Sequence, residues 1–185
     1  MQSLELPKDL PAPIDDGAAA HLIGLTLPQI EFVSTNGSCI NLGLLQGLAV
    51  IYIYPMTGRP DMKLPDGWDQ IPGARGCTPQ SCAFKDHFTE LKALNCQVFS
   101  LSTQLTDYQL EARDRLHLPF ELLSDSSLYL KRTLQLPTFF VDGNELYKRI
   151  TLIVENGNIL KTFYPVFPPD KNAEQVLDWL YANQT

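Results

Sequence analysis

Two cysteines near the middle of the chain have the types and spacing for thiol chemistry. Cys77 and Cys82 are five residues apart, and the apolar residues that follow have helical spacing: Phe84, Phe88 and Leu91. This pattern places Cys77 in the first turn of a helix, where free N–H groups and the helix dipole favour a negative charge. Because the thiolate is the reactive form of cysteine, we interpret the two residues as a redox-active pair.

The spacing of this pair also limits when the two sulfurs can bond. On one regular helix, five residues span about 7.5 Å along the axis and turn by roughly 140°. A disulfide needs Cα atoms within about 7 Å and facing Cβ vectors. A bond between Cys77 and Cys82 therefore requires the first turns of the helix to unwind. The sequence predicts a helical reduced form and a locally unfolded disulfide form.

Other interpretations of the cysteines stay open. Free cysteines are often inert and buried, although the Gly, Thr and Pro around Cys77 are not typical of a core. A zinc site that adds His87 would spread its ligands around one helix, with no second Cys or His pair nearby in the sequence. We expect no metal and no cofactor. Cys96 begins an apolar run and is interpreted as a core residue, and Cys39 is assigned no role.

The composition narrows the class of protein. The 185 residues suit one domain with a sizeable core, and a net charge of −7 leaves no basic stripe for nucleic-acid phosphates. The longest apolar run, residues 48–54, is too short to span a bilayer. The first residues do not resemble a signal peptide, so we expect a cytoplasmic protein that binds neither nucleic acid nor a membrane. In a reducing cytoplasm, a close cysteine pair is more often catalytic or metal-binding than a structural staple.

Strands and helices alternate along the chain and must position the cysteines. We expect residues 1–20 to form a loose, proline-rich arm and residues 21–185 to form a single domain. The Pro- and Gly-rich residues 55–76 predict a long loop before the cysteine helix. The predicted strands are residues 27–32, 39–42, 48–54, 97–102, 122–123, 145–154 and 159–164, and the predicted helices are residues 79–94, 107–116, 126–134 and 173–182. This order implies an α/β sandwich with a mixed sheet.

Several motifs between residues 22 and 182 resemble those of the peroxiredoxins, most of all the Q type, also called bacterioferritin-comigratory protein. The matching segments are a strand ending in Tyr-Pro (residues 42–55), Gly76-Cys77-Thr78 with Cys82 and Phe84-Lys85-Asp86, Leu-Leu-Ser-Asp (residues 122–125), and an Arg-x-Thr strand (residues 149–154) followed by Gly157. The cysteine spacing and the Arg-x-Thr strand together are fairly specific. The resemblance implies a thioredoxin-like α/β fold of the peroxiredoxin type, with a mixed β-sheet flanked by helices, that reduces hydroperoxides.

The resemblance also implies roles for individual residues. Cys77 would attack the peroxide O–O bond and become a sulfenic acid, and Cys82 would condense with it to a disulfide. Arg149 would hold its guanidinium near the thiolate and donate hydrogen bonds to the peroxide, whereas the simpler interpretation is a solvent-facing strand residue. The implied substrates are hydrogen peroxide and organic hydroperoxides, and the implied reductant is thioredoxin or a glutaredoxin-like protein. A Q-type resemblance suggests a monomer, with a dimer as the alternative.

One segment departs from the family pattern. The family has a Thr or Ser three residues before the reactive cysteine, where this chain has Ala74. Residues 56–76 are an insertion within the active-site loop itself. If residues 58–75 bulge outward, we expect Thr57 to pack beside the reactive cysteine and supply the missing hydroxyl.

The insertion allows further hypotheses. Arg75 or Arg59 would instead add positive charge near the thiolate, and the simplest interpretation is a surface flap anchored by Trp68. The missing hydroxyl also supports a different function, a non-catalytic thiol redox sensor or binding module on the same fold. A thioredoxin-type disulfide reductase is disfavoured because the chain has no Cys-x-x-Cys, and residues 136–138 are interpreted as a plain turn.

Overall fold

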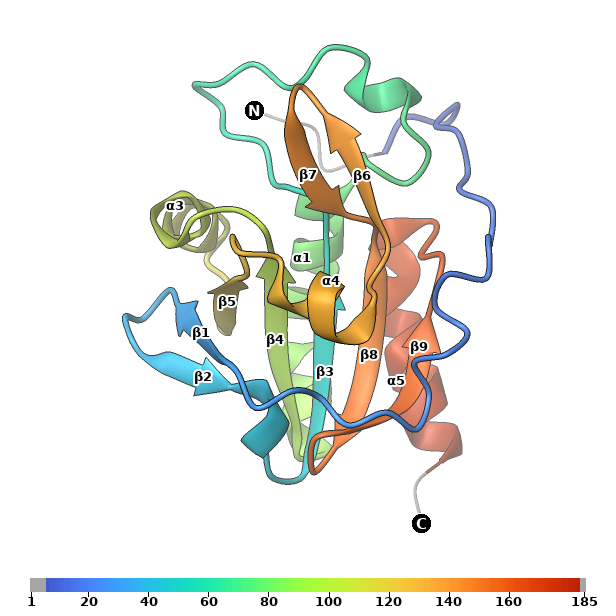
Figure 1. Cartoon of the computed structure of the whole chain (residues 1–185). Coiled ribbons are helices and arrows are strands. Elements are labelled where there is room, and N and C mark those ends of the chain that lie inside the picture. Colours follow the sequence, from blue (N-terminus) through green and yellow to red (C-terminus); the bar gives the residue numbers. More distant parts are fainter. Residues whose placement is uncertain (1–5, 184–185) are drawn as a thin grey trace.

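The computed structural model describes residues 6–183 and contains a seven-stranded mixed sheet with a separate two-stranded hairpin (Figure 1). The order of strands in the sheet is β2–β1–β5–β4–β3–β8–β9. The strands are β1 (Glu31–Ser34), β2 (Cys39–Asn41), β3 (Leu48–Ile53), β4 (Cys96–Ser102), β5 (Glu121–Ser124), β6 (Thr138–Val141), β7 (Asn144–Tyr147), β8 (Ile150–Glu155) and β9 (Asn158–Phe163). The helices are α1 (Cys77–Asp86), α2 (Phe88–Ala93), α3 (Thr106–Leu116), α4 (Tyr129–Leu134) and α5 (Asn172–Ala182).

The central strand β3 is apolar on both faces, which explains its place in the middle of the sheet. It pairs in parallel with β4 and antiparallel with β8. Ile51 and Ile53 face one core, and Tyr52 and Tyr54 face the other, as the two-residue period of a strand requires. The predicted strand over residues 48–54 is confirmed, although it ends at Ile53, one residue earlier than predicted.

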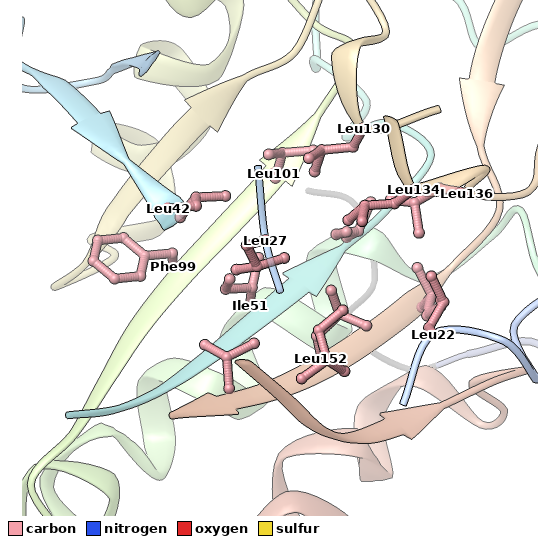
Figure 2. Close-up of a cluster of buried hydrophobic side chains, with 14 of the residues drawn as sticks. Leu22, Leu27, Leu42, Ile51, Phe99, Leu101, Leu130, Leu134, Leu136 and Leu152 are labelled. Carbon is pink, nitrogen blue, oxygen red and sulfur yellow. The ribbon is translucent and has the colours of Figure 1, made fainter. Parts of the chain in front are cut away.

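Each face of the sheet carries its own hydrophobic core. Helix α4 and the segment before β1 cover one face, where the labelled side chains of Figure 2 converge: Leu22, Leu27, Leu42, Ile51, Phe99, Leu101, Leu130, Leu134, Leu136 and Leu152. Helices α1, α2 and α5 cover the other face, and Phe84, Leu91 and Val176 are buried there. The expected mixed sheet flanked by helices is confirmed, and α1 lies against the second core.

The insertion after β3 has a small core of its own. Trp68 and Ala74 are buried against Leu146 of β7, and the rings of Trp68 and Phe139 lie 6.3 Å apart. Figure 1 shows the insertion and the β6–β7 hairpin together at the end of the sheet where the parallel strands finish. Trp68 therefore anchors the insertion against the hairpin, and the insertion is more than a surface flap.

Several predicted element boundaries are wrong for local reasons. The helix predicted over residues 79–94 begins two residues earlier and is divided into α1 and α2 at His87, whose backbone (φ −95°, ψ 8°) is not helical. The strand predicted over residues 145–154 is interrupted at residues 148–149, so its first part becomes β7 and pairs with β6. We interpreted residues 136–138 as a plain turn, but Thr138 begins β6. The first strand and α4 also begin later than predicted, at Glu31 and Tyr129.

The N-terminal segment is held against the domain, although we expected residues 1–20 to be a loose arm. Residues 6–20 contain no helix or strand, but Ala19 is buried. The Asp16 carboxylate accepts hydrogen bonds from Lys148 Nζ at 2.7 Å and from the Tyr164 hydroxyl at 2.8 Å. These bonds, led by the one from Lys148, lower the pKa of Asp16 to about 2. Residues 1–5 of the predicted arm lie outside the described residues.

Candidate active site

Helix α1 begins at Cys77 because Gly76 turns the chain with a left-handed backbone (φ 109°). A side chain at Gly76 would also collide with Pro169, since an added Cβ would lie 2.4 Å from the proline Cγ. The first turn of α1 holds no acidic residue, and Lys85 lies in its last turn. Cys77 is thus at the positive end of a ten-residue helix, as predicted.

The Arg149 guanidinium reaches the Cys77 sulfur from the residue before β8. Its Nη2 lies 3.2 Å from Cys77 Sγ, and both side chains are buried. The same nitrogen lies 3.0–3.3 Å from three carbonyl oxygens at the end of the insertion, those of Gly73, Ala74 and Arg75. The structure therefore brings Cys77 and Arg149 together, and the interpretation of Arg149 as a solvent-facing residue is wrong.

Arg149 is a buried cation whose recorded partners are neutral oxygens and one sulfur. Within residues 6–183, no carboxylate forms a salt bridge with it. A buried charge is costly unless an opposite charge or a full set of hydrogen bonds compensates it. The Cys77 sulfur is the group beside Arg149 that can become an anion. The positive guanidinium and the start of α1 therefore both lie beside the nucleophilic sulfur of Cys77.

Three buried polar side chains hold the guanidinium in place. Gln80 of α1 accepts a hydrogen bond from Arg149 Nη1 through Oε1, and its Nε2 donates to Asn172 Oδ1 at 3.0 Å. The Thr151 hydroxyl of β8 donates to the same Asn172 oxygen at 2.7 Å. Gln80, Thr151 and Asn172 have no exposed surface, so α1, β8 and α5 are joined through this chain of bonds.

Sequence reasoning missed two members of this chain of hydrogen bonds. Gln80 lies four residues before the buried Phe84, so helical spacing would have placed it on the inner face of the helix. Asn172 bonds to a residue 92 positions away, and no local pattern indicates such a contact. Thr151 belongs to the Arg-x-Thr strand that we recognised. The structure shows that its hydroxyl donates a hydrogen bond to Asn172.

Cys82 lies on the same helix and is half-buried with a free thiol. Burial raises the pKa of the Cys82 thiol, and the positive charge of Lys85 only partly opposes that effect. The structure describes both cysteines reduced on an intact helix, the form in which we predicted that the sulfurs cannot bond. Cys96 is buried, which raises its pKa to about 12, as suits a core thiol, and Cys39 is exposed.

Thr57 is buried, but its hydrogen bonds go to Gln104 and not to Cys77. Its backbone N–H donates to Gln104 Oε1 at 2.9 Å, and its hydroxyl donates to the same oxygen at 3.3 Å. Gln104 Nε2 donates back to the Thr57 carbonyl at 3.1 Å. In the part of the chain that the structure describes, Thr57 and Cys77 are not hydrogen-bonded, contrary to our expectation. Instead the carbonyl of Ala74 accepts from Cys77 Sγ at 3.7 Å.

The two arginines of the insertion pair with carboxylates. Arg75 Nη1 lies 2.8 Å from Asp69 Oδ1, and Arg59 Nη2 lies 3.0 Å from Asp61 Oδ2. The Arg59 guanidinium also lies over the Tyr108 ring, 5.4 Å from its centroid. Arg75 lines the cavity at Cys77, but its charge is paired with Asp69, as that of Arg59 is with Asp61. The arginine whose guanidinium contacts the Cys77 sulfur is Arg149.

Among residues 6–183, no group of three or more His, Cys, Asp and Glu side chains is arranged to hold a metal ion. Over the same residues, no helix is both long enough and apolar enough to cross a membrane.

The chain is similar to known proteins over most of its length. The family model described as Redoxin matches residues 23–177. The chloroplastic peroxiredoxin Q of Gentiana triflora is 25% identical over 185 residues, covering 95% of this chain and 76% of that protein. Among solved structures, peroxidoxin BcpB from Mycobacterium tuberculosis superposes with a TM-score of 0.71 at 22% identity, covering 88% of this chain and 98% of that one.

A second solved structure is similar. It is the bacterioferritin comigratory protein of Xanthomonas campestris, studied for its alkyl peroxide reduction, with a TM-score of 0.68 at 19% identity. The superposition covers 85% of this chain and 96% of that one. The likeness of both solved structures confirms the predicted thioredoxin-like fold.

Proposed function

Because this chain belongs to the Redoxin family and is a thiol peroxidase of the peroxiredoxin Q type, we propose that Cys77 is its peroxidatic cysteine. Its substrates on this proposal are hydrogen peroxide and organic hydroperoxides. The observation that carries the proposal is the buried contact of 3.2 Å between Arg149 Nη2 and Cys77 Sγ. It places a fixed cation beside a nucleophile, at the point where charge moves during peroxide cleavage.

The first step oxidises Cys77. The thiolate attacks one peroxide oxygen, so that an S–O bond forms as the O–O bond breaks, and sulfur supplies the two electrons. The leaving oxygen takes up a proton and departs as water or as an alcohol, and Cys77 becomes a sulfenic acid. The N–H groups of Arg149 stabilise the negative charge as it moves from the sulfur to the leaving oxygen.

The second step uses Cys82. Its thiol attacks the sulfenic sulfur, an S–S bond forms, and water leaves with the sulfenic oxygen. Because both residues are on α1, the helix must unwind between them before the bond forms. An external dithiol, thioredoxin or a glutaredoxin-like protein, then returns two electrons through thiol–disulfide exchange and restores both thiols.

We further propose that the protein acts as a monomer in the cytoplasm. The cytoplasmic location is our expectation from the sequence, whereas the plant relatives are named as chloroplastic. Size-exclusion chromatography of the reduced and oxidised protein tests the oligomeric state, and a dimer in both states would contradict this part of the proposal.

Peroxide consumption coupled to thioredoxin, thioredoxin reductase and NADPH tests the mechanism. Cys77→Ser should abolish turnover, whereas Cys82→Ser should complete about one turnover and then stall. Turnover of Cys77→Ser at the parent rate would contradict the role of Cys77, and parent-like steady-state rates for Cys82→Ser would remove Cys82 from the cycle. Cys96→Ser is the matched control, because this core thiol should leave the activity unchanged.

The sensor hypothesis makes a separate prediction for the same assay. It depended on the missing hydroxyl at Ala74, but Arg149 already supplies hydrogen-bond donors at the sulfur. A sensor without catalysis would show a rate constant with peroxide no better than that of a free thiol. The peroxidase proposal requires a much faster reaction of Cys77.

A further inference from the structure

The space around the reacting sulfur is small and is walled by the insertion. The cavity at Cys77 has a volume of about 30 Å³, which is about the volume of one water molecule in the liquid. Met56 and Leu64 of the insertion line it. The same two side chains also line a second and much larger hollow, so they lie between the two spaces.

We name this larger hollow the outer groove. It has a volume of about 690 Å³, within the usual size range for sites that bind small organic molecules. Its walls come from the insertion, from the loops before α3 and α4, and from the β6–β7 hairpin. The insertion that interrupts the family's active-site loop thus builds a groove separated from Cys77 by two flexible apolar side chains.

The lining of the outer groove combines apolar side chains with polar and charged ones. Leu128, Val141 and Leu146 line it together with two large apolar side chains that are left open to water, Met62 (54% exposed) and Leu105 (67% exposed). Exposed apolar side chains gathered around one concave surface indicate a binding site for an apolar group. Met56, with its flexible thioether, suits a wall that must move aside.

The charged residues of the groove restrict its ligand further. Asp66, Asp142 and Glu145 line it, against a single lysine, Lys63. Lys63 is paired with Asp66, and Glu145 is paired with Lys131, so the paired charges cancel and Asp142 leaves an excess of negative charge. This excess disfavours an anionic ligand such as a free fatty acid and favours an uncharged one.

We propose that the outer groove binds the uncharged apolar substituent of an organic hydroperoxide, while the peroxide group passes Met56 and Leu64 to reach Cys77. This inference rests on the proposed function and names the substrate class of that site. Hydrogen peroxide has no substituent, so the groove contributes nothing to its binding. The chain should therefore distinguish bulky neutral hydroperoxides from hydrogen peroxide through residues that never touch the reacting sulfur.

The test is Leu105→Asp, which places a charge in the groove without harming the fold. Leu105 is the N-cap of α3, where aspartate is among the preferred residues. The rate of Cys77 oxidation is measured in a single turnover without reductant, with cumene hydroperoxide and with hydrogen peroxide. We expect the rate with cumene hydroperoxide to fall about tenfold, the effect of disturbing an apolar substrate contact, and the rate with hydrogen peroxide to stay within about twofold.

Phe140→Asp is the matched control. Phe140 is 70% exposed on the same hairpin but does not line the outer groove, so the same charge there should change neither rate. A second substitution in the groove, Met62→Asp, should repeat the selective loss. With the parent protein, the methyl ester of a fatty-acid hydroperoxide should react faster than the free acid.

Three outcomes would overturn the inference. If Leu105→Asp lowers the rate of Cys77 oxidation equally with both peroxides, or with neither, the groove does not bind the substituent. In either case, rapid reaction of the parent with hydrogen peroxide would leave the proposed function standing. If the parent reacts with neither peroxide faster than a free thiol, the proposed function itself fails, and this inference fails with it.

Discussion

Two buried charged side chains lie at the same end of the sheet, and their surroundings differ. Asp125, in the loop after β5, accepts hydrogen bonds from the backbone N–H groups of Tyr129 and Leu130 at 2.8 and 2.9 Å. It also accepts one from the Tyr147 hydroxyl at 2.7 Å. Both carboxylate oxygens are therefore satisfied by fixed neutral donors that remain unchanged through any reaction. This is the pattern of a structural ion.

Arg149 is surrounded less completely. Its Nε has no hydrogen-bond partner in the structure, and its Nη2 is directed to backbone carbonyls and to the sulfur of Cys77. The partner that can balance its charge is thus a reactive group, and that partner changes when the sulfur is oxidised. The comparison teaches that a buried charge with neutral fixed partners stabilises the fold, whereas one that depends on a reactive partner serves chemistry.

The largest effect should come from Arg149→Lys. Lysine keeps the positive charge but loses the planar fork that reaches both Gln80 and Cys77. We expect the rate of Cys77 oxidation to fall by about 100- to 1,000-fold, as for the loss of a donor that stabilises a transition-state charge. Stopped-flow oxidation measures the rate. An unchanged rate would show that Arg149 serves only the fold.

Asp125→Ala should show the opposite behaviour. It leaves two backbone N–H groups and the Tyr147 hydroxyl without their acceptor, so the free energy of unfolding should fall by about 2–4 kcal/mol. The rate of Cys77 oxidation in the folded fraction should stay within about twofold. Urea denaturation and stopped-flow oxidation on the same sample check both halves. Asp125→Asn, which keeps one of the two acceptor oxygens, should lose less stability.

Gln80→Glu tests the comparison directly, because it gives Arg149 a carboxylate of its own. The guanidinium then has a permanent anionic partner and attracts the Cys77 thiolate less strongly. We expect oxidation of Cys77 to slow by about tenfold at pH 7, with the fold retained. The isosteric Gln80→Met is the control that removes the hydrogen bond without adding a charge. If both variants react at the parent rate, the charge balance around Arg149 has no role in catalysis.

The smallest effect concerns Cys82, whose positively charged neighbours Lys85 and Arg115 only partly oppose the effect of burial. Burial raises the pKa of this thiol, so at pH 8 less of it is thiolate in the folded protein than in the unfolded chain. In the Cys77→Ser variant, iodoacetamide should label Cys82 more slowly in the native state than in denaturant, and the labelling rate should rise with pH.

The same shift has a consequence for stability with a definite sign. The folded state holds the Cys82 proton more tightly, so this thiol's contribution to stability is present below its ordinary pKa and is lost as the pH rises above it. In the labelling experiment, faster reaction of Cys82 in the native state than in denaturant would contradict the raised pKa.

Residues with a local signal could be predicted from the sequence. The apolar run at residues 48–54 indicated a central strand, and the helical spacing after Cys77 placed this residue at the start of a helix. Arg149 followed from a family motif, and its position beside the sulfur fits that motif. The β6–β7 hairpin also had a signal that we did not use, because Asp142-Gly143 is a strong turn sequence between two β-rich segments.

Other features depend on contacts that no short pattern encodes. Asn172 completes the arginine network from a helix 92 residues away from Gln80. The insertion folds back because Trp68 packs on Phe139 and Leu146, and this packing sets the course of the segment that follows Thr57. The expected contact between Thr57 and Cys77 is therefore absent from the described residues. Gln104 binds this threonine instead, and the local sequence gives no sign of that pairing.

Trp68, described above as the anchor of the insertion, also lines the cavity at Cys77. Indole fluorescence depends on the polarity and packing around the ring, so the protein carries an optical reporter beside its reacting sulfur. The chain has only one other tryptophan, Trp179 in α5, and Trp179→Phe would leave the signal to Trp68 alone. Oxidation of Cys77, opening of α1 and reduction by the dithiol should each then be visible in real time, without any attached dye.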